Sequence, residues 1–153
     1  MAAATSDDIK RLREETSCGV IDCKKALEEA KGDFNKAKEF LRKRGLEMAA
    51  KKSDRAVKEG RVETYIHTGN KIGVLVEVNC ETDFVARNED FCRFSREVAM
   101  HIAAMAPENV PALLQQLFVR EPGKSIQDLL NELVAKIGEN IVVSRFMRFK
   151  VGE

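Results

Sequence analysis

This 153-residue sequence contains no tryptophan, one tyrosine and only two histidines, and its apolar residues never form a long run. A membrane-spanning helix needs about 20 consecutive apolar residues, so we expect no membrane association. His67 and His101 are too few for a histidine-rich metal cluster. The four cysteines have neither the close pairing of a zinc site nor the density of a disulfide scaffold. We therefore expect no metal and no cofactor.

Sequence motifs of enzymes are missing as well. The chain has no glycine-rich phosphate loop, no nucleophile elbow and no zinc-protease helix. Its carboxylates are scattered, and neither His67 nor His101 has a partner that the sequence identifies. A surface or packing role is the ordinary explanation for such histidines. The sequence thus predicts a protein that is not an enzyme.

The charge is nearly balanced at a net +1, which argues against a strong electrostatic grip on nucleic acid. Residues 1–58 hold 15 basic and 11 acidic residues, and the remainder holds 11 basic and 14 acidic ones. The basic residues alternate with glutamates, as on a solvated helix face. The first eight residues carry two acids and no base, unlike a secretory signal or a transit peptide. We expect a cytoplasmic protein, or the mature form of an organellar one.

Residues 1–55 predict an N-terminal domain of three helices. The first should end near Ser17, and Gly32 should stop the second. Asp33 can cap the third, which should end at Gly45. Three short helices with tight connections make a compact bundle. Such a bundle resembles the ubiquitin-associated type of domain, which is generally a binding module.

Residues 56–153 predict an α+β domain. Alternation of apolar and polar residues indicates strands, and spacing of three and four indicates helices. The expected architecture is a three-stranded antiparallel sheet with helices on one face. The expected strands are 61–67, 72–78 and 140–149, and the expected helices are 89–104 and 126–137.

The other face of this sheet is expected to be partly apolar, because the last strand has apolar residues on both of its sides. An uncovered apolar face is well covered by a second copy of the same sheet. The sequence therefore predicts a symmetric homodimer. The residues expected on one side of the last strand are Ile141, Val143, Met147 and Phe149, with Val142 and Phe146 on the other.

The most informative stretch is residues 79–87, here named the signature turn, where an apolar strand runs into a short turn before the helix that Asn88 can cap. Phe84 stands in this turn beside the charged Asp83. A bulky apolar residue next to a carboxylate either folds back into the core or is offered to a partner. The residues alone leave both possibilities open.

The sequence of this turn is Asn79-Cys80-Glu81-Thr82-Asp83-Phe84-Val85-Ala86-Arg87. It closely resembles the signature of the translation elongation factor Ts family. Residues 9–27 and 136–141 are also similar to stretches of that family. Its members are nucleotide exchange factors for elongation factor Tu, the GTPase that delivers aminoacyl-tRNA to the ribosome. Longer members have a second core repeat, a coiled-coil insertion and a C-terminal module.

The resemblance implies a set of residues that bind the GTPase. The signature turn would enter it near the magnesium and phosphate site, and the N-terminal domain would dock on another of its helices. The residues implied at the first contact are Thr82, Asp83, Phe84 and Val85, and those at the second are Lys10, Leu12, Arg13, Gly19 and Val20.

The resemblance also bears on the dimer. A helix similar to the one around His101 belongs to the second core repeat of longer members, where it contacts another domain of the GTPase. We therefore expect His101 of one subunit to cooperate with Asp83 and Phe84 of the other, in a homodimer that binds two GTPase molecules. No direct contact with nucleic acid is expected.

Two other functions remain open at this stage. A ubiquitin-associated-like adaptor or chaperone without exchange activity would use the N-terminal bundle and leave the signature turn unexplained. A small RNA-binding protein would use the basic segments, but the near-neutral charge and the few clustered aromatic residues argue against it.

Overall fold

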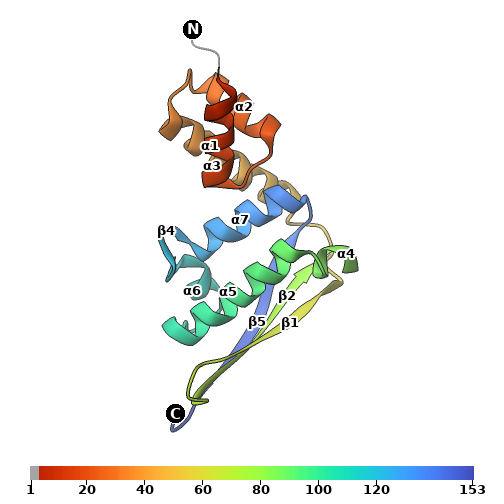
Figure 1. Cartoon of the computed structure of the whole chain (residues 1–153). Helices are drawn as coiled ribbons and strands as arrows, with labels where there is room; N and C mark the ends of the chain where they lie inside the picture. Colours follow the sequence, from red (N-terminus) through yellow and green to blue (C-terminus); the bar gives the residue numbers. More distant parts are fainter. Residues whose placement is uncertain (1–3) are drawn as a thin grey trace.

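The computed structural model describes residues 4–153, so residues 1–3 of the predicted N-terminal domain lie outside the described part. The N-terminal helices and the sheet with its covering helices lie at opposite ends of the molecule (Figure 1). The elements are α1 (Ser6–Thr16), α2 (Val20–Glu29), α3 (Phe34–Lys52), β1 (Glu59–Ile66), β2 (Ile72–Cys80), α4 (Asp83–Ala86), α5 (Glu89–Met105), α6 (Val110–Gln115), β3 (Leu117–Phe118), β4 (Glu121–Ser125), α7 (Ile126–Ile137) and β5 (Ile141–Lys150).

Helices α1 to α3 enclose a small core of their own. Thr5 and Asp8 form a capping box at the start of α1, and Ser17 ends that helix in the left-handed conformation. These local signals explain why the predicted first helix is confirmed. The side chains that fill this core are those of Leu12, Cys23, Ala26, Leu27, Ala30, Ala37 and Leu41.

The prediction that the third helix ends at Gly45 is wrong, because α3 continues to Lys52. Gly45 lies where α3 crosses α7. A Cβ on this residue would lie 3.7 Å from the Asn131 carbonyl oxygen and 3.9 Å from the Ala135 Cβ. The glycine therefore allows close helix packing and does not cap a helix, and α3 links the N-terminal bundle to the α+β part.

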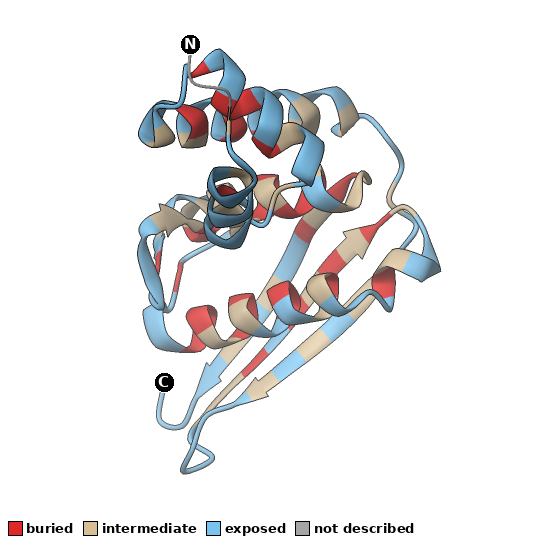
Figure 2. Cartoon of the chain, turned by 45° about the horizontal axis from the view of Figure 1, so that its top comes forward, coloured by how far each residue is buried: buried red, intermediate tan, exposed pale blue. Residues whose placement is uncertain are grey.

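The α+β prediction is confirmed. The sheet has the order β1-β2-β5 with antiparallel neighbours. Helices α5 and α7 cover one of its faces, and buried residues gather between these helices and the sheet (Figure 2). On the central strand, Val74, Val76 and Val78 point into this core. Asn88 caps α5 as predicted, with its side-chain oxygen accepting from two backbone amides.

A β-bulge interrupts the last strand. Glu77 pairs with Arg145, but the next residue, Val78, pairs with Val143. Ser144 is thus an extra residue on β5, and such a residue reverses the alternation of side chains beyond it.

The bulge overturns the predicted assignment of sides on β5. Ile141 is buried against the helices, and so is one side of Phe146, whereas Met147 and Phe149 point to the opposite face with Val142. The expectation that Ile141 and Met147 share a side is wrong. An alternation counted from sequence cannot register an inserted residue.

The second face of the sheet carries no helix. We name it the open sheet face, defined by five apolar residues. Cross-strand pairing places Leu75 beside Met147, and Phe149 follows two residues along β5. All five side chains are substantially exposed. They are Val62, Ile66, Leu75, Met147 and Phe149.

The segment between α5 and α7 holds a short helix and a two-stranded hairpin, β3–β4. Pro122 and Gly123 lie inside β4 and do not simply break the chain. Ser125 and Asp128 form a capping box at the start of α7, the expected helix 126–137. No helix in residues 4–153 combines the length and the apolar character that crossing a membrane requires.

Candidate functional site

Phe84 is the most exposed large apolar side chain in the described chain, with 80% of its surface accessible. It lies on α4, a single helical turn at one end of the sheet, directly after β2 (Figure 1). The Thr82 side chain caps this turn by accepting from the Val85 amide at 3.4 Å. Of the two possibilities that the sequence left open, the folded chain has the exposed one.

The inner side of α4 is anchored. Ala86 is buried and Val85 packs against the main core, so only the outer side of the turn faces solvent. There Asp83 pairs with Arg87 at 3.1 Å, and the Arg87 guanidinium lies 5.8 Å from the centre of the Phe84 ring. An exposed ion pair contributes little to stability. Asp83 and Phe84 are therefore free to exchange their contacts for those of a partner.

The strand that precedes the turn ends at Cys80, and the next two backbone amides find a partner from another part of the chain. Glu139 accepts from the amides of Glu81 and Thr82, both at 3.1 Å, and from the Thr82 hydroxyl at 2.8 Å. Hydrogen bonds to an ionised acceptor are stronger than neutral ones. The turn that displays Phe84 is thus bound to the connection between α7 and β5.

The side chains around the turn do not form a reactive group. Burial and, after it, the nearby Glu139 carboxylate raise the pKa of the Cys80 thiol to about 11. This thiol remains protonated and donates to the Thr82 carbonyl at 3.1 Å. Within residues 4–153, no three His, Cys, Asp or Glu side chains group together as metal ligands. The arrangement can present an apolar ring and a carboxylate, which is binding chemistry.

His101 has no exposed surface. Its Nδ1 accepts from the Val119 amide at 3.3 Å, so its Nε2–H donates to the Gln116 side-chain oxygen at 2.9 Å. Burial lowers the pKa of this histidine, which favours the neutral ring. In the single chain His101 therefore offers no surface to a partner, and its expected contact beside Asp83 and Phe84 stays a prediction. His101 is a packing residue that holds the β3 region against α5.

The predicted docking residues of the N-terminal domain separate into two groups. Leu12 is fully buried in the bundle core of the single chain, and its expected contact with a partner stays a prediction. The other four are exposed: Lys10 and Arg13 lie on α1, and Gly19 and Val20 lie at the start of α2.

Sequence reasoning missed Ile21, which is 69% exposed beside the exposed Val20. A signal was present. The buried residues of α2 include Cys23, Ala26 and Leu27, and Ile21 does not belong to their helical stripe. An aliphatic pair at the start of a helix and outside its apolar stripe indicates a contact surface.

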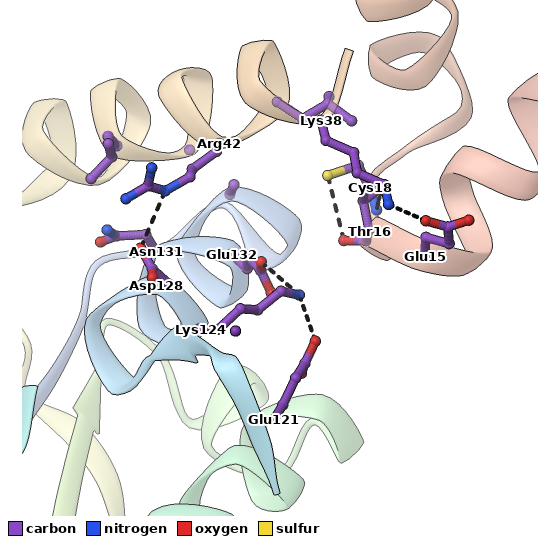
Figure 3. Close-up of a pocket in the computed structure, with 15 residues that line it drawn as sticks. Glu15, Thr16, Cys18, Lys38, Arg42, Glu121, Lys124, Asp128, Asn131 and Glu132 are labelled. Atoms are coloured by element: carbon purple, nitrogen blue, oxygen red, sulfur yellow. Dashed lines mark hydrogen bonds and ion pairs between the residues drawn. The ribbon is translucent and has the colours of Figure 1, made fainter. Parts of the chain in front are cut away.

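A hollow of the surface lies between α3, the end of α1 and the α7–β4 region, with a volume of about 600 Å³ (Figure 3). Its charged side chains are paired with one another. Arg42 meets Asp128 at 3.5 Å, and Lys124 meets Glu132 at 3.0 Å and Glu121 at 3.3 Å. The remaining two, Lys38 and Glu15, form an ion pair of their own.

Burial raises the pKa of Glu132 despite the neighbouring Lys124. The opposite balance holds for the lysine, since burial lowers its pKa but the hydrogen bond and charge of Glu132 outweigh this and raise it. The charges of Lys124 and Glu132 therefore balance each other within the hollow. This hollow lies between the N-terminal bundle and the α+β part, and the charged residues that line it are all paired with one another.

Comparison with known proteins identifies sequences related to this chain. The sequence model of the family described as Elongation factor TS matches residues 81–153, which begin within the turn. Elongation factor Ts of Desulfotalea psychrophila is 45% identical over 195 aligned positions, covering 98% of this chain and 99% of the relative. Elongation factor Ts of Anaeromyxobacter sp. is 46% identical over 198 positions, covering 100% of this chain and 90% of the relative.

The chain belongs to the elongation factor Ts family. It is thereby a translation elongation factor. The aligned positions outnumber the 153 residues of this chain, so these relatives contain residues within the matched region that have no counterpart here. Elongation factor Ts of Geobacter sulfurreducens shows the same relation, with 43% identity over 194 positions.

Proposed function

We propose that this chain promotes the release of GDP from elongation factor Tu by inserting the outer side of α4 near the magnesium and phosphate site of the GTPase. The observation that carries the proposal is the 80% exposure of Phe84 on a helical turn whose other side is anchored. A protein keeps a large aromatic ring in water at a cost. Binding a partner recovers that free energy.

Exchange by this route is differential binding. Burial of a phenylalanine side chain contributes about 1.5 to 3 kcal/mol, and each ~1.4 kcal/mol changes an affinity tenfold. If the pocket for Phe84 opens only when the phosphate loop is distorted, this energy weakens nucleotide binding. Asp83 adds a negative charge that disfavours the magnesium-bound phosphates. Because linkage is reciprocal, nucleotide weakens the complex by the same factor, and the chain acts without chemistry of its own.

The N-terminal bundle supplies a second contact in this proposal. Lys10, Arg13, Gly19 and Val20 are exposed on the bundle, and Ile21, beside Val20, adds a further exposed apolar side chain. Docking through this surface would hold the factor on the GTPase in the cytoplasm while the signature turn acts. Thr82 caps the turn and Val85 anchors it, and neither needs to enter the partner.

The open sheet face supports a homodimer. Five exposed apolar side chains lie together on three neighbouring strands. Apolar residues on a protein surface are usually scattered singly, and a cluster of them marks an interaction surface. Two-fold symmetry pairs a surface with the same surface of a second copy, so the open sheet face of one chain can cover that of the other. Since α4 lies at the end of the sheet (Figure 1), each subunit keeps its own signature turn accessible, and one dimer binds two GTPase molecules.

The exchange proposal is tested by the release rate of fluorescent GDP from elongation factor Tu. We expect the native chain to accelerate release, and Phe84→Ala to reduce the acceleration by about 10-fold to 150-fold, the range that corresponds to 1.5 to 3 kcal/mol. Asp83→Ala should reduce it as well. Leu117→Ala is the matched control, because this side chain is 59% exposed on β3, outside the signature turn.

Full activity of the Phe84→Ala variant would refute the assigned site. No acceleration by the native chain would refute the exchange function and leave a binding module without exchange activity.

A further inference from the structure

Three segments that lie far apart in the sequence meet at the base of the signature turn. They are residues 52–55 at the end of α3, residues 81–82 after β2, and residues 138–140 between α7 and β5. Gly138 ends α7 with φ +87°, a left-handed conformation that favours glycine. This sharp stop places Glu139 beside the turn.

The contacts in this cluster are reciprocal. Glu139 accepts from Glu81 and Thr82 of the turn, and the Glu81 carboxylate in return accepts from the Asn140 amide at 2.8 Å. Arg55 lies 3.5 Å from the same Glu81 oxygen. Two carboxylates thus fasten the two connections to each other.

The same cluster reaches the segment that leads out of the N-terminal domain. The Asn140 side chain donates to the Arg55 carbonyl at 2.8 Å and to the Ser53 carbonyl at 3.4 Å. The Lys52 ammonium donates to the Gly138 carbonyl at 2.7 Å. Hydrogen bonds therefore connect the end of α3, the α7–β5 connection and the signature turn.

We propose that Glu139 is a positioning residue for nucleotide exchange, and that the cluster around it holds the signature turn in a defined orientation relative to the N-terminal docking surface. The inference rests on the proposed function. It assigns to Glu139 no contact with the GTPase.

The physical reason is the size of α4. A helix of four residues is too short to be stable alone, and its own surface pair, Asp83 with Arg87, contributes little. The two amides of Glu81 and Thr82 come after the last ladder residue of β2, and in residues 4–153 their acceptor is the Glu139 carboxylate. Loss of the carboxylate frees the turn, and Phe84 must then be ordered at the moment of binding.

The test compares Glu139→Ala, Glu139→Gln and the control Glu108→Ala in the GDP release assay. Glu108 is an exposed carboxylate in the connection after α5. We expect Glu139→Ala to lower the maximal release rate about tenfold or more. The glutamine keeps an oxygen that can accept both amides, so it should restore most of the rate, and Glu108→Ala should behave as the native chain.

A double variant separates positioning from a general loss of stability. If Glu139 acts through the turn, then Glu139→Ala slows the Phe84→Ala variant by a smaller factor than it slows the native chain, because only the contribution of Asp83 remains to be lost. Independent effects that multiply would overturn the inference. So would a native rate in Glu139→Ala.

Amide hydrogen exchange of the free chain gives a readout that does not depend on the GTPase. The Glu81 and Thr82 amides should exchange at least tenfold faster in Glu139→Ala, while amides in the middle of β2 remain protected. Unchanged protection at these two amides would refute the role of Glu139 in holding the turn, even if nucleotide exchange is confirmed. If these two amides exchange their hydrogens faster but the native chain releases no GDP, the proposed function is refuted, whereas the role of Glu139 in holding the turn is supported.

Discussion

Phe149 offers a sharp test of the proposed dimer. The side chain is 65% exposed on the open sheet face of the single chain. Full burial of a phenylalanine contributes about 1.5 to 3 kcal/mol, so covering this exposed part would contribute about 1 to 2 kcal/mol. A two-fold interface contains every residue twice. Phe149→Ser should therefore weaken association by about 2 to 4 kcal/mol, or roughly 30-fold to 1,000-fold in Kd.

Sedimentation equilibrium from nanomolar to tens of micromolar chain measures this change directly. Leu117→Ser is the control, because Leu117 has nearly the same exposure, 59%, but lies on β3 in the other sheet. We expect the control to dimerise as the native chain does. A native chain that stays monomeric at tens of micromolar would refute the dimer. An equal weakening by both substitutions would show that the open sheet face is not its interface.

Three further predictions concern stability. Burial lowers the pKa of His101 in the folded chain, so below about pH 6.5, the ordinary histidine value, the unfolded chain binds a proton that the folded chain does not. The free energy of unfolding, measured by urea titration, should fall as the pH drops through this range by at most ~1.4 kcal/mol per pH unit. His101→Gln should flatten that slope, and an unchanged slope would contradict the assignment. Leu12→Ala removes a fully buried side chain from the small N-terminal core and should cost about 2 to 5 kcal/mol. NMR spectra should show α1 and α2 disordered while the sheet resonances persist, and an intact bundle would contradict the assignment of Leu12 to this core. At Gly60 a Cβ would lie 2.3 Å from the Val78 carbonyl oxygen, so Gly60→Ala should lower the melting temperature markedly, whereas Gly69→Ala, where a Cβ meets nothing within 4 Å but φ is +94°, should cost only the backbone strain of about 1 to 2 kcal/mol.

Local signals in the sequence were sufficient for most of the fold. The capping residues Thr5, Asn88 and Ser125 all begin helices in the structure, because a side-chain oxygen can satisfy a free helical amide without help from the rest of the chain. The apolar run in residues 72–78 likewise predicted a strand. Hydrogen bonds and apolar periodicity within a few residues are enough for such elements.

The signature turn was also recognisable from sequence, since its nine contiguous residues resemble those of the family. Its exposure was not. Whether Phe84 turns into the core depends on the capping by Thr82 and on Val85 and Ala86, which occupy the inner side of α4. That is a matter of packing against distant residues.

Tertiary structure alone decided the remaining features. Gly45 reads as a helix stop, but the contact with α7 makes it part of a continuous helix. The bulge at Ser144 changes which face Met147 and Phe149 occupy, because register depends on the partner strand. His101 becomes a buried residue through groups 15 and 18 positions away. Helix caps and apolar periodicity are encoded over a few neighbouring residues, whereas burial and register arise only when segments far apart in the chain meet.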